Sequence, residues 1–496
     1  MLDPTVLIFL SSGLFLGWSL GANDAANVFG TAVGSRMVRF TTAAVICGVF
    51  VILGAFVSGT GAAQTLGKLG AVNALGGSFM AALAAGLTVY WMTKFGLPVS
   101  TSQAIIGSII GWNLFSDSYT DLSSLRKILS TWIICPLLSA VIAAFLFTLA
   151  KAFVRNIGIG LVRLDGYTRL ALILAGAFGA YSLGANNIAN VMGVFVPVAP
   201  FPEMQLSQGL SISSAQQLFL MGGLAIAVGV FTYSKRVMMT VGSELMTLTP
   251  LAAWVAVMAH SIVLFLFASE RLEQLLASFS LPTIPLVPVS SSQAVVGAVL
   301  GIGLLQGGKE IQWPRVYSIV KGWAITPVIS CFLCFVGLYF LQNVFQQTVQ
   351  RESQYVLSTQ VIEKIKKEGM QTDGLEELSG IIFRNSAELI RKIESKIKLS
   401  GKQALQIINF SLKNRLIVTK ASLKTLEKTS FSASQFEALR RLSGQSFNHA
   451  WQLGDALAEM NKEWQLRGGG LKNKLHDRKI KQKLSYLNRT FHWRTP

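Results

Sequence analysis

A short polar stretch interrupts the first apolar segment of the chain. It reads Gly21-Ala22-Asn23-Asp24-Ala25-Ala26-Asn27, and it returns as Gly184-Ala185-Asn186-Asn187-Ile188-Ala189-Asn190. Asp24 is the only Asp or Glu inside an apolar segment of the first 350 residues. An ionisable side chain at such depth in a membrane is costly, so it indicates a functional site by default.

The two copies favour a cation site. Gly and Asn are poor helix residues, so we expect each copy to break its helix and free backbone carbonyl oxygens. A small hard cation such as Na⁺ would suit those oxygens. The predicted cation-binding residues are Asn23, Asp24, Asn186 and Asn187, with Asp24 and Asn23 as metal ligands if the ion is Na⁺. The alternative is that the Asn side chains only join helices, as they do in membrane bundles.

A second polar stretch is also duplicated. Pro98-Val99-Ser100-Thr101-Ser102-Gln103-Ala104 matches Pro288-Val289-Ser290-Ser291-Ser292-Gln293-Ala294. Pro fits the first turn of a helix, Ser and Thr cap its free amides, and a helix N-terminus is a ready anion site. Plain capping is the alternative. We predict a tetrahedral oxyanion bound by Ser100, Thr101, Ser102, Ser290, Ser291 and Ser292, together with Asn27 and Asn190.

These stretches lie in a chain that is too apolar for a soluble protein. Its 496 residues are 51% hydrophobic, and its mean hydropathy is +0.51. We predict ten apolar segments, five in each half, at 5–33, 41–62, 71–93, 97–115, 128–150, 169–200, 214–233, 248–268, 286–305 and 316–346. An odd number of crossings per half would invert the second half relative to the first. The segments 97–115 and 286–305 could instead re-enter as hairpins.

The last third of the chain has a different composition. From Gln350 onward there are 27 Lys and Arg against 14 Asp and Glu, a net charge of +13. Apolar residues there recur at helical spacing, which predicts a helical bundle. The basic end of the chain is expected to be a solvated, disordered tail or to contact anionic lipid or an acidic partner. No folded nucleic-acid-binding motif accompanies the charge.

The predicted fold is an all-α membrane protein. It has two inverted repeats with broken helices and, as an option, re-entrant hairpins, followed by a soluble helical domain. The predicted boundaries are 1–155 for the first transmembrane repeat, 156–349 for the second, 350–466 for the helical bundle and 467–496 for the basic tail.

The two motifs, each present twice, resemble those of the inorganic phosphate transporter family, the PiT permeases. The resemblance covers about residues 5–346. It implies inverted repeats, a phosphate site at their interface, coupling to Na⁺ or H⁺, and a homodimer. The chain departs from the family pattern where Asn187 stands for Asp, and where Val51, Gln64 and Met239 stand for acids. These losses affect the choice and number of coupling ions.

We therefore predict a secondary transporter, not an enzyme, that moves inorganic phosphate by Na⁺ or H⁺ symport without a cofactor. We expect it to be a multi-pass protein of a cell membrane, namely the bacterial inner membrane, where it spans the lipid bilayer. We expect it to bind no nucleic acid. The alternatives are a sulfate permease on the same scaffold, an intramembrane enzyme, or a sensor with a basic signalling tail. His260, the only His in the membrane segments, is expected to be a core or interface residue, with proton relay as the alternative.

Overall fold

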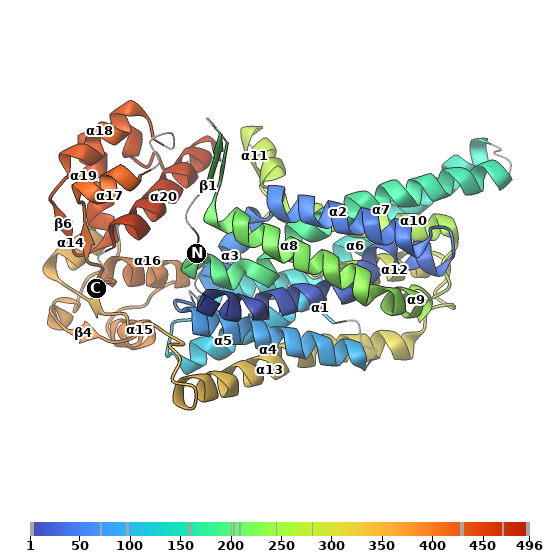
Figure 1. Ribbon diagram of the computed structural model, residues 1–496, viewed down its shortest axis with the longest axis horizontal. Coiled ribbons are helices and arrows are strands. Elements are labelled where there is room, and N and C mark those ends of the chain that lie inside the picture. Colours follow the sequence, from blue (N-terminus) through green and yellow to red (C-terminus); the bar gives the residue numbers. More distant parts are fainter. Residues whose placement is uncertain are drawn as a thin grey trace. The chain divides into compact units, whose positions relative to one another are not determined.

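Helices form most of both units into which the chain divides (Figure 1). One unit contains Met1–Ser116, Leu122–Leu272 and Ile284–Arg351, and the other contains Asp117–Asp121, Glu273–Thr283 and Glu352–Pro496. The computed structural model describes residues 4–69, 72–95, 99–157, 161–199, 201, 204–207, 210–244, 246–279, 281–426, 431–468 and 471–492.

Long apolar helices dominate the first unit. Within the described residues, eight helices are long and apolar enough to cross a membrane. They are α1 (Pro4–Gly34), α2 (Phe40–Ser58), α4 (Leu75–Lys94), α6 (Leu122–Ile157), α7 (Leu161–Met192), α8 (Ser214–Thr232), α10 (Pro250–Ala268) and α13 (Trp313–Asn343). The chain is therefore a multi-pass membrane protein, as predicted.

Shorter elements complete this unit. They are α3 (Thr60–Leu69), α5 (Thr101–Phe115), η1 (Gly193–Val198), β1 (Met204–Ser207), β2 (Leu210–Ile212), α9 (Ser234–Glu244) and α12 (Ser291–Leu305). The helix α11 (Glu270–Ser278) is divided, because its residues from Glu273 onward belong to the other unit. The predicted segments 97–115 and 286–305 correspond to α5 and α12, which have 15 residues each and are about 22 Å long. Neither helix reaches across a hydrocarbon core of about 30 Å on its own.

Both Gly-Ala-Asn stretches lie within continuous helices, so the prediction of broken helices is wrong there. Gly21 and Gly184 serve close packing instead. A Cβ on Gly21 would lie 2.0 Å from the carbonyl oxygen of Ile226 in α8, and one on Gly184 would lie 2.1 Å from that of Val51 in α2. Because the helices stay hydrogen-bonded, no backbone carbonyl is freed and any ligand atoms must come from side chains.

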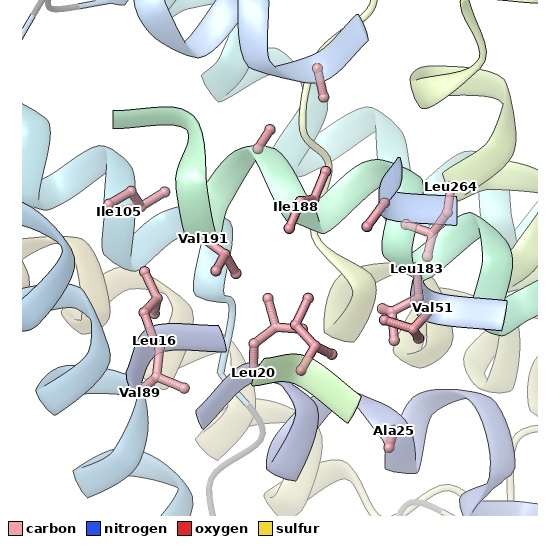
Figure 2. Close-up of a cluster of buried hydrophobic side chains, with 14 of the residues drawn as sticks. Leu16, Leu20, Ala25, Val51, Val89, Ile105, Leu183, Ile188, Val191 and Leu264 are labelled. Carbon is pink, nitrogen blue, oxygen red and sulfur yellow. The ribbon is translucent and has the colours of Figure 1, made fainter. Parts of the chain in front are cut away.

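Helices of each sequence half pack against helices of the other half. α1 packs against α8 and α9, and α7 packs against α2 and α3. Likewise, α5 packs against α13 and α12 packs against α6. Both of the latter contacts place a glycine on a proline carbonyl, Gly107 on Pro327 and Gly297 on Pro136. Figure 2 shows the shared core, where Leu20, Val51 and Ile188 lie together with side chains of other helices.

The second unit has many short elements. They are β3 (Tyr355–Val356), α14 (Thr359–Lys367), η2 (Glu376–Leu378), β4 (Ile382–Phe383), α15 (Ser386–Glu394), α16 (Gly401–Ser411), β5 (Leu416–Ile417), α17 (Lys420–Thr425), α18 (Ala433–Arg441), β6 (Ser446–Phe447), α19 (Ala450–Met460), η4 (Lys462–Trp464) and α20 (Leu471–Phe491). The predicted helical domain thus also contains two small antiparallel sheets, β3–β4 and β5–β6.

This unit is built twice from one module. In each copy a strand is followed by a helix, by a second helical segment (η2 or α18) that leads into Leu-Ser-Gly, and then by a second strand and another helix. The glycine of that triplet donates its N–H to the residue after the first strand: Gly380 to Leu357 over 2.9 Å, and Gly444 to Val418 over 2.7 Å. Both glycines have positive φ, +80° and +91°, a conformation that strongly favours glycine.

The basic end of the chain is part of this second unit. Residues 471–491 form α20, and its Ile480, Leu487 and Phe491 are buried in one cluster with Leu416 and Val418. The expectation of a disordered, solvated tail is therefore wrong, because an apolar stripe on this basic helix completes the core.

Two short connections also lie in the second unit, although the predicted boundaries assign them to the membrane repeats. The N–H of Tyr119 donates to Ser386 Oγ over 2.9 Å. Arg478 of α20 forms an ion pair with Glu273 at 3.3 Å. Residues 117–121 lie between α5 and α6 in the chain, so part of this connection belongs to the second unit.

Candidate functional site

Serine caps both of the predicted helix starts. Ser100 Oγ accepts a hydrogen bond from the N–H of Gln103 over 3.2 Å, and Ser290 Oγ accepts one from Gln293 over 3.2 Å. Both serines are buried, 2% and 1% exposed. The residues that follow them, Thr101, Ser102, Ser291 and Ser292, form the first turns of α5 and α12 and are also buried.

The two helix starts lie next to each other. Ser102 Oγ of α5 donates to the carbonyl of Val289, directly before α12, over 3.1 Å. Ser290 Oγ and Ser292 Oγ are 3.1 Å apart. The positive ends of two helix dipoles therefore meet in one buried region, which is an arrangement that favours an anion.

A chain of hydrogen bonds surrounds the one carboxylate. Asn23 Nδ2 donates to Asp24 Oδ1 over 2.8 Å, and Asn187 Nδ2 donates to Asp24 Oδ2 over 3.0 Å. Asn187 Oδ1 in turn accepts from Asn186 over 2.7 Å and from Asn190 over 3.2 Å. Asp24 and Asn187 occupy the same place in the two motif copies, so the pair joins α1 to α7.

Each Gly-Ala-Asn copy reaches the helix start that belongs to the other half of the sequence. Asn27 Nδ2 donates to Ser291 Oγ over 2.9 Å, and Asn190 Nδ2 donates to Ser102 Oγ over 2.7 Å. Within the second half, Asn186 also exchanges two hydrogen bonds with the backbone of Val289, at 2.7 and 3.0 Å. The groups assigned to the cation and those assigned to the anion are thus adjacent parts of one buried site.

Several buried oxygen atoms of this region have no hydrogen-bond partner among the described residues. They belong to Thr101 Oγ1, Gln103 Oε1, Asn190 Oδ1 and Gln293 Oε1. A buried polar atom without a partner costs about 1–3 kcal/mol, so these oxygens indicate where a ligand would be stabilised. The site residues inferred from sequence did not include Gln103 and Gln293, although both copies of the motif contain this glutamine.

The side-chain oxygen atoms around Asp24 can be compared with the ligands that a bound cation prefers. The side chains offer carboxylate, amide and hydroxyl oxygens, the ligand type that hard cations prefer. Asn23 Oδ1 is 3.4 Å from Thr93 Oγ1, and both oxygens of Asp24 accept amide hydrogen bonds. The oxygen atoms available are therefore of the type that Na⁺ binds. Asp24 carries the only formal negative charge among the residues named for this site.

The family's other acidic positions contain no acid in this chain. Val51 is fully buried and packs by its backbone against Gly184. Met239 is 49% exposed. The side chain of Gln64 lies outside the described residues. Asn187 has the most direct consequence, because its amide donates to Asp24 at the place where the resemblance implies a second carboxylate.

Fold and site together define a membrane transport protein: a helical, multi-pass chain whose buried polar residues surround meeting helix N-termini. A model of the phosphate transporter family matches residues 20–273 and 277–483. The chain belongs to this family.

Curated relatives and a solved structure agree with this assignment. A relative from Thermococcus kodakarensis, provisionally named a phosphate permease, is 28% identical over 418 residues, covering 67% of this chain and 98% of its own. A protein of Arabidopsis thaliana named "Inorganic phosphate transporter 2-1, chloroplastic" is 22% identical over 445 residues, covering 69% and 73%. A structure titled "The sodium-dependent phosphate transporter" covers 68% of this chain and 99% of its own, with a TM-score of 0.53 and 22% identity. This last likeness concerns the fold.

Proposed function

We propose that this protein moves inorganic phosphate across a membrane by cation symport. The observation that carries the proposal is a buried polar region at the two helix starts. Asn190 links the amides around Asp24 to Ser102 of α5, and Asn27, from the same motif as Asp24, donates to Ser291 of α12. Membership of the phosphate transporter family supports the choice of substrate. Homodimerisation and contact with anionic lipid remain predictions.

The proposed anion site lies at the starts of α5 and α12. Backbone N–H groups of the first turns and the hydroxyls of Thr101, Ser102, Ser291 and Ser292 would bind the oxygens of phosphate, supported by Asn27 and Asn190. These donors are neutral, so the helix dipoles would supply the positive potential. Ser100 and Ser290 cap the two helices and would hold the first turns in place.

The unpartnered acceptors favour phosphate over sulfate. At neutral pH phosphate still carries a proton on one or two oxygens and can donate a hydrogen bond, whereas sulfate cannot. Three buried acceptors receive no hydrogen bond from any described residue: Gln103 Oε1, Gln293 Oε1 and Asn190 Oδ1. A substrate that donates to one of them would remove a desolvation cost that sulfate would leave in place.

The coupling ion would bind at or near Asp24. Na⁺ would use oxygens of Asp24, Asn23, Asn186 or Asn187, and H⁺ would use the Asp24 carboxylate itself. A positive charge there stabilises an anion in a medium of low dielectric, where an unpaired ion is expensive. Because Asn187 and Val51 replace acids, we expect few cations per transported anion.

We also infer that residues 1–155 and 156–349 are inverted repeats. The packing between the halves supports this, because two helix contacts recur with the halves interchanged: α1–α8 corresponds to α7–α2, and α5–α13 corresponds to α12–α6. Asp24 and Asn187 then lie where the two repeats meet, so the motif that carries the coupling charge is at the repeat interface.

Uptake by purified protein in liposomes tests the proposal. We expect ³²P-phosphate uptake driven by an inward Na⁺ gradient or an inward proton gradient, and weak competition by sulfate. Uptake of ³⁵S-sulfate in preference to phosphate would make the chain a sulfate permease. Phosphate uptake that ignores both gradients would replace symport by facilitated diffusion or exchange.

A further inference from the structure

His260 lies against the proposed anion site. It is fully buried in α10, and its Nε2 is 2.9 Å from Ser291 Oγ at the start of α12. The same hydroxyl oxygen accepts a hydrogen bond from Asn27 Nδ2 over 2.9 Å. The other ring nitrogen, His260 Nδ1, is buried and has no partner among the described residues.

The direction of the His260–Ser291 hydrogen bond decides what Ser291 can do. A serine hydroxyl has two lone pairs and one hydrogen, and an amide nitrogen can only donate. Asn27 therefore fills one lone pair of Ser291 Oγ. If His260 accepts, the hydroxyl hydrogen is used up; if His260 donates, both lone pairs are filled and the hydrogen is free for a ligand.

The surroundings of the ring select the second arrangement. With the proton on Nδ1, the imidazole would bury an N–H that no acceptor of the described residues meets. Orphaned buried N–H groups are rarer than under-satisfied acceptors. With the proton on Nε2, the unpartnered Nδ1 is only a lone pair. The tautomer of a histidine follows the hydrogen bonds that its two nitrogens make, so Nε2–H donates to Ser291.

We propose that His260 is a positioning residue that makes Ser291 a dedicated hydrogen-bond donor to an unprotonated oxygen of the bound oxyanion. The inference rests on the proposed function and adds a specificity element to it. The counterpart of Ser291 in the first motif copy is Thr101, whose Oγ1 has no hydrogen-bond partner in the part of the chain that the structure describes. The two helix starts therefore differ: the hydroxyl at α12 is preset as a donor, whereas the one at α5 can donate or accept.

The consequence is an oriented substrate. A phosphate oxygen that carries a proton could not donate it to Ser291, because Asn27 and His260 already fill both lone pairs of Ser291 Oγ. It would turn instead towards acceptors such as Gln103 Oε1 or Gln293 Oε1. His260 would thus help to choose which phosphate oxygen faces which helix start, without itself touching the ion.

The test compares variants at His260 in phosphate uptake by the full chain in liposomes. The Gln side chain of His260→Gln can place an N–H where Nε2 lies, whereas His260→Ala removes the donor. We expect His260→Ala to raise the KM for phosphate about 10-fold with an unchanged maximal rate, since a hydrogen bond to a charged group carries that order of affinity. His260→Gln should stay within about 2-fold of the unsubstituted protein.

A double-variant cycle separates positioning from packing. Ser291→Ala should raise KM at least as much as His260→Ala, and the two together should raise it no further than Ser291→Ala alone. Ser261→Ala is the matched control, because this buried neighbour donates only to its own helix, at Val257. Stabilisation of detergent-purified variants by phosphate, read as a thermal shift, checks binding independently of insertion.

Three outcomes would overturn the inference. Equal KM values for His260→Gln and His260→Ala, or additive effects of His260→Ala and Ser291→Ala, would make His260 a packing residue while leaving phosphate transport intact. Absence of phosphate uptake and of phosphate stabilisation in the unsubstituted chain would instead overturn the proposed function, and this inference with it.

Discussion

Exchanging the charged and the neutral member of the Asp24–Asn187 pair tests the centre of the site. Every facing pair of atoms there matches a donor with an acceptor. Asn23 and Asn187 each donate to one oxygen of Asp24, and Asn186 donates to Asn187 Oδ1. The pattern depends on one carboxylate and one amide occupying these two positions.

Asp24→Asn alone should break this pattern. If the new amide accepts from Asn23, its nitrogen faces the nitrogen of Asn187, and two donors meet. Turning the Asn187 amide around only moves the mismatch to Asn186. A lost hydrogen bond to a charged group costs about 1.5–3 kcal/mol, which corresponds to a fall in uptake of about 10- to 150-fold.

The double variant Asp24→Asn with Asn187→Asp should recover uptake to within about 5-fold of the original. The new amide at position 24 then donates to the new carboxylate at position 187, and Asn23 and Asn186 keep their acceptors. Asn187→Asp alone would place two carboxylates about 3 Å apart, and such a pair holds a proton or needs an additional cation. We expect that variant to require more Na⁺ or a lower pH.

The assay is initial ³²P-phosphate uptake into liposomes, normalised to inserted protein. Folding of each variant is checked by its elution as a single species in detergent. A folded double variant as inactive as Asp24→Asn would refute the reasoning, because the charge would then matter only at position 24. Full activity of Asp24→Asn would show that neutral oxygens suffice for coupling.

Three other parts of the molecule lead to further expectations. The double variant Ser100→Ala with Ser290→Ala removes both helix caps, each worth about 1 kcal/mol. We therefore expect the KM for phosphate to rise at least 10-fold. An altered Na⁺ dependence at unchanged KM would contradict this. A chain ending at Arg351 should still take up phosphate in liposomes, because every residue of the candidate site precedes it; loss of uptake in inserted protein would make the C-terminal unit part of the transport machinery. Burial lowers the pKa of His449, whose Nδ1–H donates to the carbonyl of Leu412. The unfolded form therefore binds a proton at His449 before the folded form does, as the pH falls below about 6.5, and this lowers the stability of the fold. Amide hydrogen exchange in α19 should accordingly become faster below that pH. His449→Asn, which copies Asn385 of the first module, should abolish that change; an unaltered pH response would assign it to another group.

The sequence by itself determined the class of protein and the identity of the polar residues. Apolar segments of membrane-spanning length are a one-dimensional property, and each of the ten predicted segments contains a helix. The duplicated motifs were also readable, because a repeated heptapeptide in register needs no coordinates. The capped starts of α5 and α12 follow from local chemistry, since Ser100 and Ser290 each cap a helix within one turn. Proline was expected in the first turn, but Pro288 lies before the cap Ser290.

The tertiary structure decided how those residues are used. Local propensity predicts a break at Gly21 and Gly184, but packing overrides it, because each glycine admits the backbone of a neighbouring helix. The same is true of the basic end of the chain, where three apolar residues of α20 are buried against strand β5. Charge pattern alone favours a solvated tail, and only long-range contacts show otherwise.

The pairing of the motifs is also a tertiary property. No local rule states that Asn27 meets Ser291 or that Asn190 meets Ser102, 264 and 88 residues away along the chain. The helices exchange partners between the halves, so residues far apart in sequence share one buried site. His260 belongs to the same case: in the sequence it is a lone histidine, and the fold places its Nε2 on the hydroxyl of Ser291.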